Sequence, residues 1–265
     1  LWILFLIINP NSSEIQGIKS VKTEYDSYYA EIDKKIEKEV MDILFDVAVR
    51  SASSNGMYSY SLIHVTDKEK KSQIAKVCAQ PYVESTSDLV VFVVDIYRNR
   101  QIAMEKGLEL EHLGEDMDNF LQGASDALIS AQNMVVAAES MGIGTVFFGS
   151  ILGDVQKMCD ILKLPELTFP VIAVGLGYSD VEPALKPRLP KKMQIFENEY
   201  ESFDNYCNKL KEFDEEMNKY FDTRDMTVTV GKFSTQIFNK MKNSKGRNRN
   251  LIEEIEKRGF KTKLI

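Results

Sequence analysis

The sequence predicts a mixed α/β sandwich, in which helices flank a buried sheet and a polar helical arm follows. Short continuous apolar runs are typical of strands buried on both faces, and amphipathic helical patterns alternate with them along the chain. The residues after Glu201 are rich in charge. With 265 residues, the chain is long enough for one such domain and an excursion from it.

The first half of the chain alternates between helix and strand patterns. Residues 36–50 place apolar side chains on one helical face, and the small residues Ser51–Gly56 after them predict a loop. A strand is expected over Tyr58–Val65 and a helix over Asp67–Cys78. The uninterrupted apolar run Asp88–Ile96 predicts a strand buried on both faces.

The second half continues this pattern and then changes. Met117–Met141 predicts a long helix whose alanines let neighbouring helices approach closely. Two more buried strands are expected, over Gly144–Gly149 and Phe169–Gly177, with a helix over Asp154–Leu162 between them. From Glu201 onward we expect helices with too few apolar residues for a core of their own, and therefore an arm lying on another surface.

The N-terminal residues 1–16 are assigned to a leader or a fragment. The run Leu1–Ile8 is strongly apolar, but eight residues are too short to span a bilayer. A truncated signal or anchor and a buried strand or helix start are the alternatives. We expect no membrane association.

Composition excludes several classes of protein. The net charge of −7 makes nucleic acid an unsuitable partner. The three cysteines, Cys78, Cys159 and Cys207, are odd in number and lack a CxxC motif, which favours a reducing, cytoplasmic compartment. His64 and His112 lack ligand spacing, so no metal site is expected, and His64 is interpreted as a half-buried strand histidine.

Catalytic motifs of other enzyme classes are missing from the sequence. Gly175-Leu176-Gly177 lacks the third glycine of a dinucleotide fingerprint and is interpreted as a turn. No GxSxG, P-loop or HExxH occurs, so hydrolase and kinase functions have no support. Two basic clusters stand out instead: Lys19-Ser20 with Lys22, and Lys186-Pro187-Arg188, whose proline stiffens the loop. Such clusters are usually solvated surface charge, and a shared phosphate is the alternative.

The stretch from DALISAQNMVVAAES to LKPRLP, residues 126–190, resembles the nitroreductase family, and more closely its NADPH-preferring oxygen-insensitive nitroreductases and flavin reductases. The alanine-rich helix, the Gly-x-Gly before a strand ending in glycine, and the LKPRLP loop carry the resemblance, which extends over roughly residues 17–240. It implies an α+β sandwich of nitroreductase-like fold: a mainly antiparallel sheet flanked by helices, a C-terminal helical arm, and a homodimer. Residues 17–200 would be the FMN-binding domain and 201–265 a helical extension on the dimer.

The resemblance also implies an FMN site. The matching positions, taken residue by residue, are Lys19, Ser20, Val21, Lys22, Ser53, Gln80, Phe147, Phe148, Gly149, Ser150, Lys186 and Arg188. Of these, Lys186 and Arg188 would hold the phosphate and ribityl chain, and Arg224 would meet the 2′-phosphate of NADPH. This chain has Ile18, Lys19 and Lys22 where the family has histidine and arginines, and lysine keeps the charge without the bidentate fork.

The function implied by the resemblance is ping-pong reduction of nitroaromatics, quinones or free flavins by NADPH or NADH. The chemistry lies on FMN, so no catalytic side chain is expected. Acceptor choice would lie in the segments Asn55–Tyr58 and Arg98–Glu115. Two alternatives stay open: a reductase of disulfides or azo dyes, and a flavin-binding protein of this fold with little turnover.

Overall fold

The protein consists of two compact units, and each is described by itself. The structure is a computed structural model that describes residues 35–109, 111–178, 186–222, 225–243 and 250–262. The first unit comprises Leu1–Glu182 and Asn250–Ile265, and the second comprises Pro183–Arg249. The residues after Glu201 are divided between the two units.

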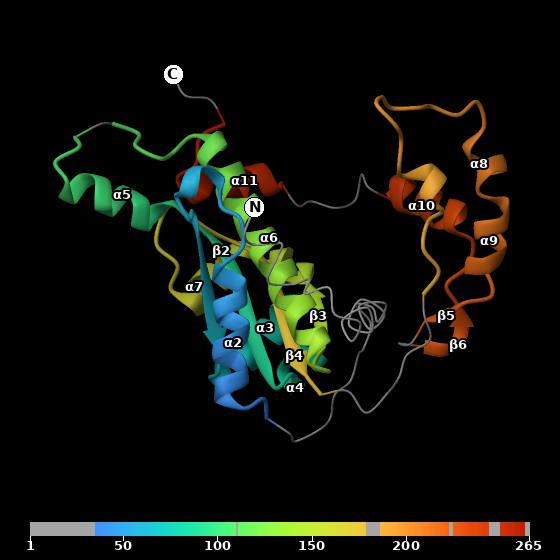
Figure 1. Ribbon diagram of the computed structural model, residues 1–265, viewed down its shortest axis with the longest axis horizontal. Helices are drawn as coiled ribbons and strands as arrows, with labels where there is room; N and C mark the ends of the chain where they lie inside the picture. The colour runs from blue at the N-terminus through green and yellow to red at the C-terminus, as the bar shows by residue number, and fades with distance from the viewer. Residues whose placement is uncertain (1–34, 110, 179–185, 223–224, 244–249, 263–265) are drawn as a thin grey trace, which may run out of the picture. The chain divides into compact units, whose positions relative to one another are not determined.

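The first unit is built on a four-stranded antiparallel sheet in the order β1-β2-β4-β3 (Figure 1). The strands are β1 Tyr60–Val65, β2 Asp88–Asp95, β3 Gly144–Phe148 and β4 Thr168–Gly177. All four lie where the sequence predicts strands. The antiparallel pairing that the resemblance implies is confirmed.

Helices cover both faces of this sheet, as Figure 1 shows. The helices of the unit are α2 Lys38–Val49, α3 Lys68–Cys78, α4 Tyr82–Ser85, α5 Ile96–Glu105, α6 Met117–Ser140, α7 Val155–Leu162 and α11 Leu251–Lys257. Side chains alternate along β2: Val90 and Phe92 pack with α2 and α6, whereas Leu89 and Val91 pack with α3 and α7. The prediction of a strand buried on both faces is confirmed.

Aspartates define where the helices of the first unit begin. The carboxylates of Asp67, Asp116 and Asp154 accept hydrogen bonds from backbone N–H groups of the first turns of α3, α6 and α7. Asp95, the last residue of β2, caps α5 in the same way. The sequence analysis missed α5, because a single aspartate both ends the strand and starts the helix.

Small residues on α6 allow the close packing that the sequence predicts. Ala127, Ala131 and Ala138 are fully buried in the core cluster that α6 shares with α2 and the sheet. At Gly123 the approach is closer still, since a Cβ atom there would lie 2.5 Å from the carbonyl oxygen of Ser59. The alanine-bearing helix is therefore the central helix of this face.

The second unit corrects the expectation of a purely helical arm without a core. Its elements are 3-10 helix η4 Lys191–Met193, α8 Tyr206–Lys209, α9 Lys211–Met217, β5 Phe221–Asp222, β6 Asp225–Thr229 and α10 Phe233–Lys242. Leu210, Phe213 and Met217 form a small core, packed by partly buried apolar residues that include Leu189 and Phe233. An antiparallel β5–β6 hairpin, which the sequence analysis did not predict, is also present.

The last helix, α11, packs on the first unit of the same chain. Ile255 and the fully buried Phe260 join the core cluster at the end of the sheet, where Phe260 stacks edge-on against Phe120. Arg258 donates hydrogen bonds to the carbonyl oxygens of Leu164, Pro165 and Thr168. The C-terminal residues thus complete a core that begins far away in the sequence.

His64 occupies the position expected of a half-buried strand histidine. Its Nε2 lies 2.7 Å from Asp88 Oδ1, and its ring packs edge-on against Phe45. Among the described residues, no group of three or more histidines, cysteines or acids could hold a metal ion. Within the same residues, no helix is long and apolar enough to cross a membrane.

Candidate functional site

The serine loop between α2 and β1 is fixed by one buried acid on α6. Asp126 accepts hydrogen bonds from Ser53 Oγ at 3.1 Å, from the Ser54 backbone N–H at 2.8 Å and from Ser54 Oγ at 3.0 Å. The loop continues into the short 3-10 helix η2 Ser54–Gly56, where Asn55 has a left-handed φ of 52°. Ser53, a predicted flavin contact, thus lies on a loop that hydrogen bonds to Asp126 hold in place.

Gln80 and Ser150 are joined, although 70 residues separate them. Helix α3 ends at Cys78, its C-cap Ala79 has the left-handed conformation, and Gln80 follows directly. Ser150, in the 3-10 helix η3 Gly149–Gly153 after β3, donates to Gln80 Oε1 at 2.5 Å. This bond leaves the Gln80 amide nitrogen as the group that can donate to a ligand.

Cys78 adds a third polar group beside this pair. The thiol is buried, and burial raises its pKa against the opposing effect of a hydrogen bond with Ser150. Because the thiolate is the reactive form, burial and the raised pKa both disfavour reactivity of Cys78. The Gln80–Ser150 pair therefore lies beside a buried thiol that bonds to Ser150.

The end of β3 presents backbone, not a side chain, beside these residues. Phe148 is buried in the core and packs against Tyr82 with ring centroids 5.7 Å apart, whereas Phe147 packs on the opposite face of the sheet. Gly149 is exposed, and a Cβ atom there would meet nothing within 4 Å. Packing does not require glycine at this position, so the open space next to the backbone suits a flat ligand.

Two segments predicted to select the acceptor contact each other. From α5, Arg98 donates to the carbonyl oxygens of Tyr58 and Tyr60, and Asn99 Nδ2 donates to that of Met57 at 3.0 Å. An Asp95 carboxylate 3.6 Å away holds the Arg98 guanidinium. The start of α5 therefore braces the exposed tip of the serine loop.

The remaining predicted residues belong to other parts of the chain. Lys186 and Arg188 belong to the second unit, where Arg188 is exposed and donates to the Lys186 carbonyl oxygen at 3.4 Å. The segment Lys19–Lys22 and Arg224 lie outside the described residues. That these cations converge with Ser53 and Gln80 on one cofactor stays a prediction.

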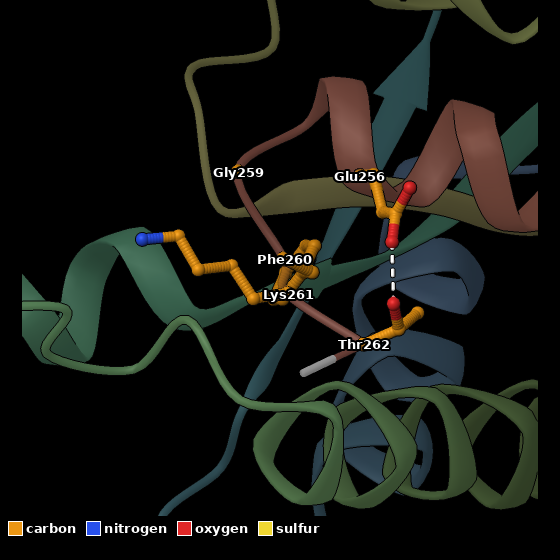
Figure 2. Close-up of a pocket in the computed structure, with 5 residues that line it drawn as sticks. All are labelled: Glu256, Gly259, Phe260, Lys261 and Thr262. Carbon is orange, nitrogen blue, oxygen red and sulfur yellow. Dashed lines mark hydrogen bonds between the residues drawn. The ribbon is translucent and has the colours of Figure 1, made fainter. Parts of the chain in front are cut away.

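A cavity of about 320 Å³ lies elsewhere in the first unit, at the C-terminal turn after α11 (Figure 2). Its lining residues are Glu256, Gly259, Phe260, Lys261 and Thr262. Figure 2 shows the Thr262 hydroxyl donating to Glu256 and the Lys261 side chain extending away from that pair. None of the residues predicted to bind a cofactor lines this cavity.

The sequence analysis assigned no role to Asp126, and it named Arg98 and Asn99 only as part of the acceptor segment Arg98–Glu115. Asp126 had a visible signal, since an acid on the alanine-rich face of a long helix must find buried partners. Asp126 is 1% exposed, and buried Gly123 and Ser130 flank it on the same helical face. No pattern in the sequence predicts the individual contacts of Arg98 and Asn99, whose partners are mostly backbone carbonyl groups.

The comparisons with known proteins agree with this fold. The Nitroreductase family profile matches residues 32–178, and that of the Nitroreductase family C-terminal domain matches residues 186–263. The chain therefore belongs to the nitroreductase family, as the resemblance implied.

Individual relatives of this chain carry names that state an activity. The FMN reductase (NADPH) of Bacillus subtilis is 34% identical over 212 residues, which cover 79% of this chain and 85% of that protein. An NADPH-dependent oxidoreductase of Staphylococcus saprophyticus is 33% identical over 82% of this chain and 87% of its own.

Solved structures give the same result. The NfrA1 nitroreductase from B. subtilis has a TM-score of 0.83 and 31% identity, covering 92% of this chain and 98% of its own. The NADPH:FMN oxidoreductase from Vibrio harveyi, solved with NAD⁺, has a TM-score of 0.79 and 26% identity over the same shares. The expected nitroreductase-like fold is confirmed.

Proposed function

We propose that this chain is an FMN-dependent NAD(P)H oxidoreductase that reduces small acceptors such as nitroaromatics, quinones or free flavins. Family membership over both matched regions supports the proposal, as do relatives named for NADPH-dependent reduction of FMN. The observation that carries it is the open backbone at Gly149 beside the fixed Gln80–Ser150 pair.

The donor set of the first unit fits FMN. An isoalloxazine ring offers flat apolar faces and an edge of carbonyl and ring nitrogen acceptors. The Gln80 amide nitrogen is free of the Ser150 bond and can donate to that edge, while Gly149 allows close approach of backbone. When bound, FMN supplies the transfer of hydride from the nicotinamide and of electrons to the acceptor.

The protein's own part is binding and orientation. In this proposal, Lys186, Arg188, Lys19 and Lys22 bind the FMN phosphate, because a dianion requires several charged donors. The FMN-binding part would comprise residues 17–200. One site accepts nucleotide and acceptor in turn, which predicts ping-pong kinetics.

Specificity for the nucleotide is assigned to Arg224, whose planar guanidinium would bind the 2′-phosphate of NADPH. The NADPH-dependent relatives support this assignment. Because the sequence has no second cation among Thr227–Val230, we expect the preference over NADH to be modest. NADH remains a usable donor in this proposal.

A homodimer is part of the proposal, supported by an exposed apolar face on α2 and α6. Leu121, Leu128 and Ile129 of α6 are 46–57% exposed, and they follow the spacing of one helical face. Ile43 and Val49 of the adjoining helix α2 are about as exposed. A second copy of the chain would remove this surface from water.

We place the protein in the cytoplasm within this proposal. All three cysteines, buried Cys78 and Cys159 and exposed Cys207, are free thiols. Free thiols suit a reducing compartment.

A reconstitution experiment tests the proposal and its alternatives. The purified protein is mixed with FMN, freed of excess flavin and treated anaerobically with NADPH. We expect a yellow protein that bleaches. A yellow protein that does not bleach would indicate a flavin binder with little turnover, and a colourless one would refute both functions. Reduction of a disulfide or azo dye in preference to quinones and nitroaromatics would favour the remaining alternative.

A further inference from the structure

The carboxylate of Asp126 is buried, and among the described residues its hydrogen-bond donors come from the serine loop. Asp126 is 1% exposed. Within the described part of the chain, its hydrogen-bond partners are Ser53 and Ser54, and no cation there lies within ion-pair distance of its carboxylate. A buried carboxylate needs hydrogen bonds to compensate for lost hydration. The loop and the acid therefore hold each other in place.

The single proton of the Ser53 hydroxyl is used in the hydrogen bond to Asp126. Ser53 Oγ donates to Asp126 Oδ2 at 3.1 Å, and the same oxygen accepts from the Tyr58 backbone N–H at 2.9 Å. An ionised carboxylate only accepts, and a hydroxyl has one hydrogen and two acceptor positions. One acceptor position remains, so Ser53 Oγ meets a further ligand as an acceptor.

We propose that Asp126 is a positioning residue for the cofactor: it fixes the Ser53–Ser54 turn and makes the Ser53 hydroxyl an acceptor for a donor group of FMN. This inference rests on the proposed function. FMN carries such donors at the ring N3–H and at the ribityl hydroxyls. Its phosphate, a dianion near neutral pH, offers none, so Ser53 and the cations have separate tasks.

The substitution Asp126→Asn tests the inference because it keeps the shape and reverses one bond. An asparagine can still accept from the Ser54 N–H and hydroxyl through Oδ1, but its amide nitrogen then faces Ser53 Oγ as a donor. The Ser53 proton is forced toward the ligand, where two donors would meet. We therefore expect Asp126→Asn to weaken FMN more than Ser53→Ala, which only removes the acceptor.

The loop offers a matched control. Asn55 Nδ2 donates to Gln122 Oε1 at 3.3 Å, a second tie between the same loop and α6 that is solvent-exposed. Gln122→Ala removes this tie without touching Ser53. We expect FMN binding of Gln122→Ala to equal that of the wild type, and thermal melts without flavin to show all variants folded.

Dissociation constants measured by quenching of flavin fluorescence decide the question. We expect Ser53→Ala to bind FMN about tenfold more weakly and Asp126→Asn about a hundredfold more weakly. The double variant should be no weaker than Asp126→Asn, because the two residues act as one unit. Equal FMN binding by Asp126→Asn and wild type would overturn the inference, and so would losses that add in the double variant.

Flavin analogues identify the donor. Weaker binding of 3-methyl-FMN to wild type, with no such difference in Ser53→Ala, would assign the ring N3–H, and equal binding would assign a ribityl hydroxyl. If riboflavin binds equally to all variants while FMN does not, Ser53 serves the phosphate and the inference is refuted. A wild type that binds no flavin refutes the proposed function itself, which is a different result from a wild type and an Asp126→Asn variant that bind alike.

Discussion

Two glycines of the first unit have different expected roles: Gly149 leaves space for the cofactor, and Gly123 allows close packing. At Gly149, a Cβ atom would meet nothing within 4 Å, so Gly149→Ala should change the free energy of unfolding by no more than about 0.5 kcal/mol. If FMN lies over this backbone, the added methyl group occupies its space. We then expect FMN affinity to fall about tenfold or more, a loss of roughly 1.4 kcal/mol.

At Gly123 the same change should act on stability. A Cβ atom there would lie 2.5 Å from the Ser59 carbonyl oxygen and 2.9 Å from Val94 Cγ1. The Ser59 oxygen is backbone and also accepts from the Asp95 N–H at 2.9 Å, so it cannot move aside freely. Overpacking costs about 1–3 kcal/mol, and the helix propensity of alanine offsets at most about 1 kcal/mol of it.

Thermal melts without flavin and fluorescence titrations with FMN measure both effects. Gly123→Ala should lose about 1–2 kcal/mol, which lowers Tm by roughly 2–8 °C for a domain of this size. Gly149→Ala should melt like the wild type and bind FMN less tightly. Undiminished FMN binding by Gly149→Ala would refute the cofactor assignment of that open space, and a raised Tm for Gly123→Ala would refute the packing argument.

Three further predictions concern the removal of individual positive charges. Lys186→Ala and Arg188→Ala should each weaken FMN by about 1.5–3 kcal/mol in titrations, because charge-assisted hydrogen bonds to phosphate are lost; unchanged affinity in both would contradict the phosphate site. The hydrogen bond from Lys261, at 2.7 Å, holds the pKa of Glu115 below its ordinary value. The stability from this pair is therefore present at neutral pH and lost as the pH falls through the folded pKa, so the loss of Tm caused by Lys261→Ala should be full at neutral pH and should shrink as Glu115 becomes protonated in acid. Arg224→Ala should lower kcat/KM for NADPH about tenfold and leave NADH nearly unchanged; equal losses for both would remove Arg224 from nucleotide selection.

The sheet and its helices could be predicted because their signals are local. The run from Leu89 to Val94 is apolar at every position, which is typical of a strand covered on both faces, and the structure confirms this strand. The core of the second unit was not predicted. Its core joins Leu189 to Phe213 and Phe233, and each residue alone resembles a scattered surface apolar group.

The candidate site was less accessible from the sequence. The resemblance supplied Ser53, Gln80 and Ser150, but their interactions join residues about 70 positions apart, which no spacing pattern encodes. The role of Asp126 follows only once its three hydrogen bonds are known.

The central claim is that one flavin site receives hydride from the nicotinamide and passes electrons to a separate acceptor. The most direct measurement is to run the two half-reactions apart. The FMN-loaded protein is reduced anaerobically with one equivalent of NADPH, freed of nucleotide by gel filtration, and mixed with a quinone or nitroaromatic. We predict that the visible flavin absorbance disappears in the first step and returns fully in the second. Absorbance that persists with both NADPH and NADH, or reduced flavin that no acceptor reoxidises, would contradict the account.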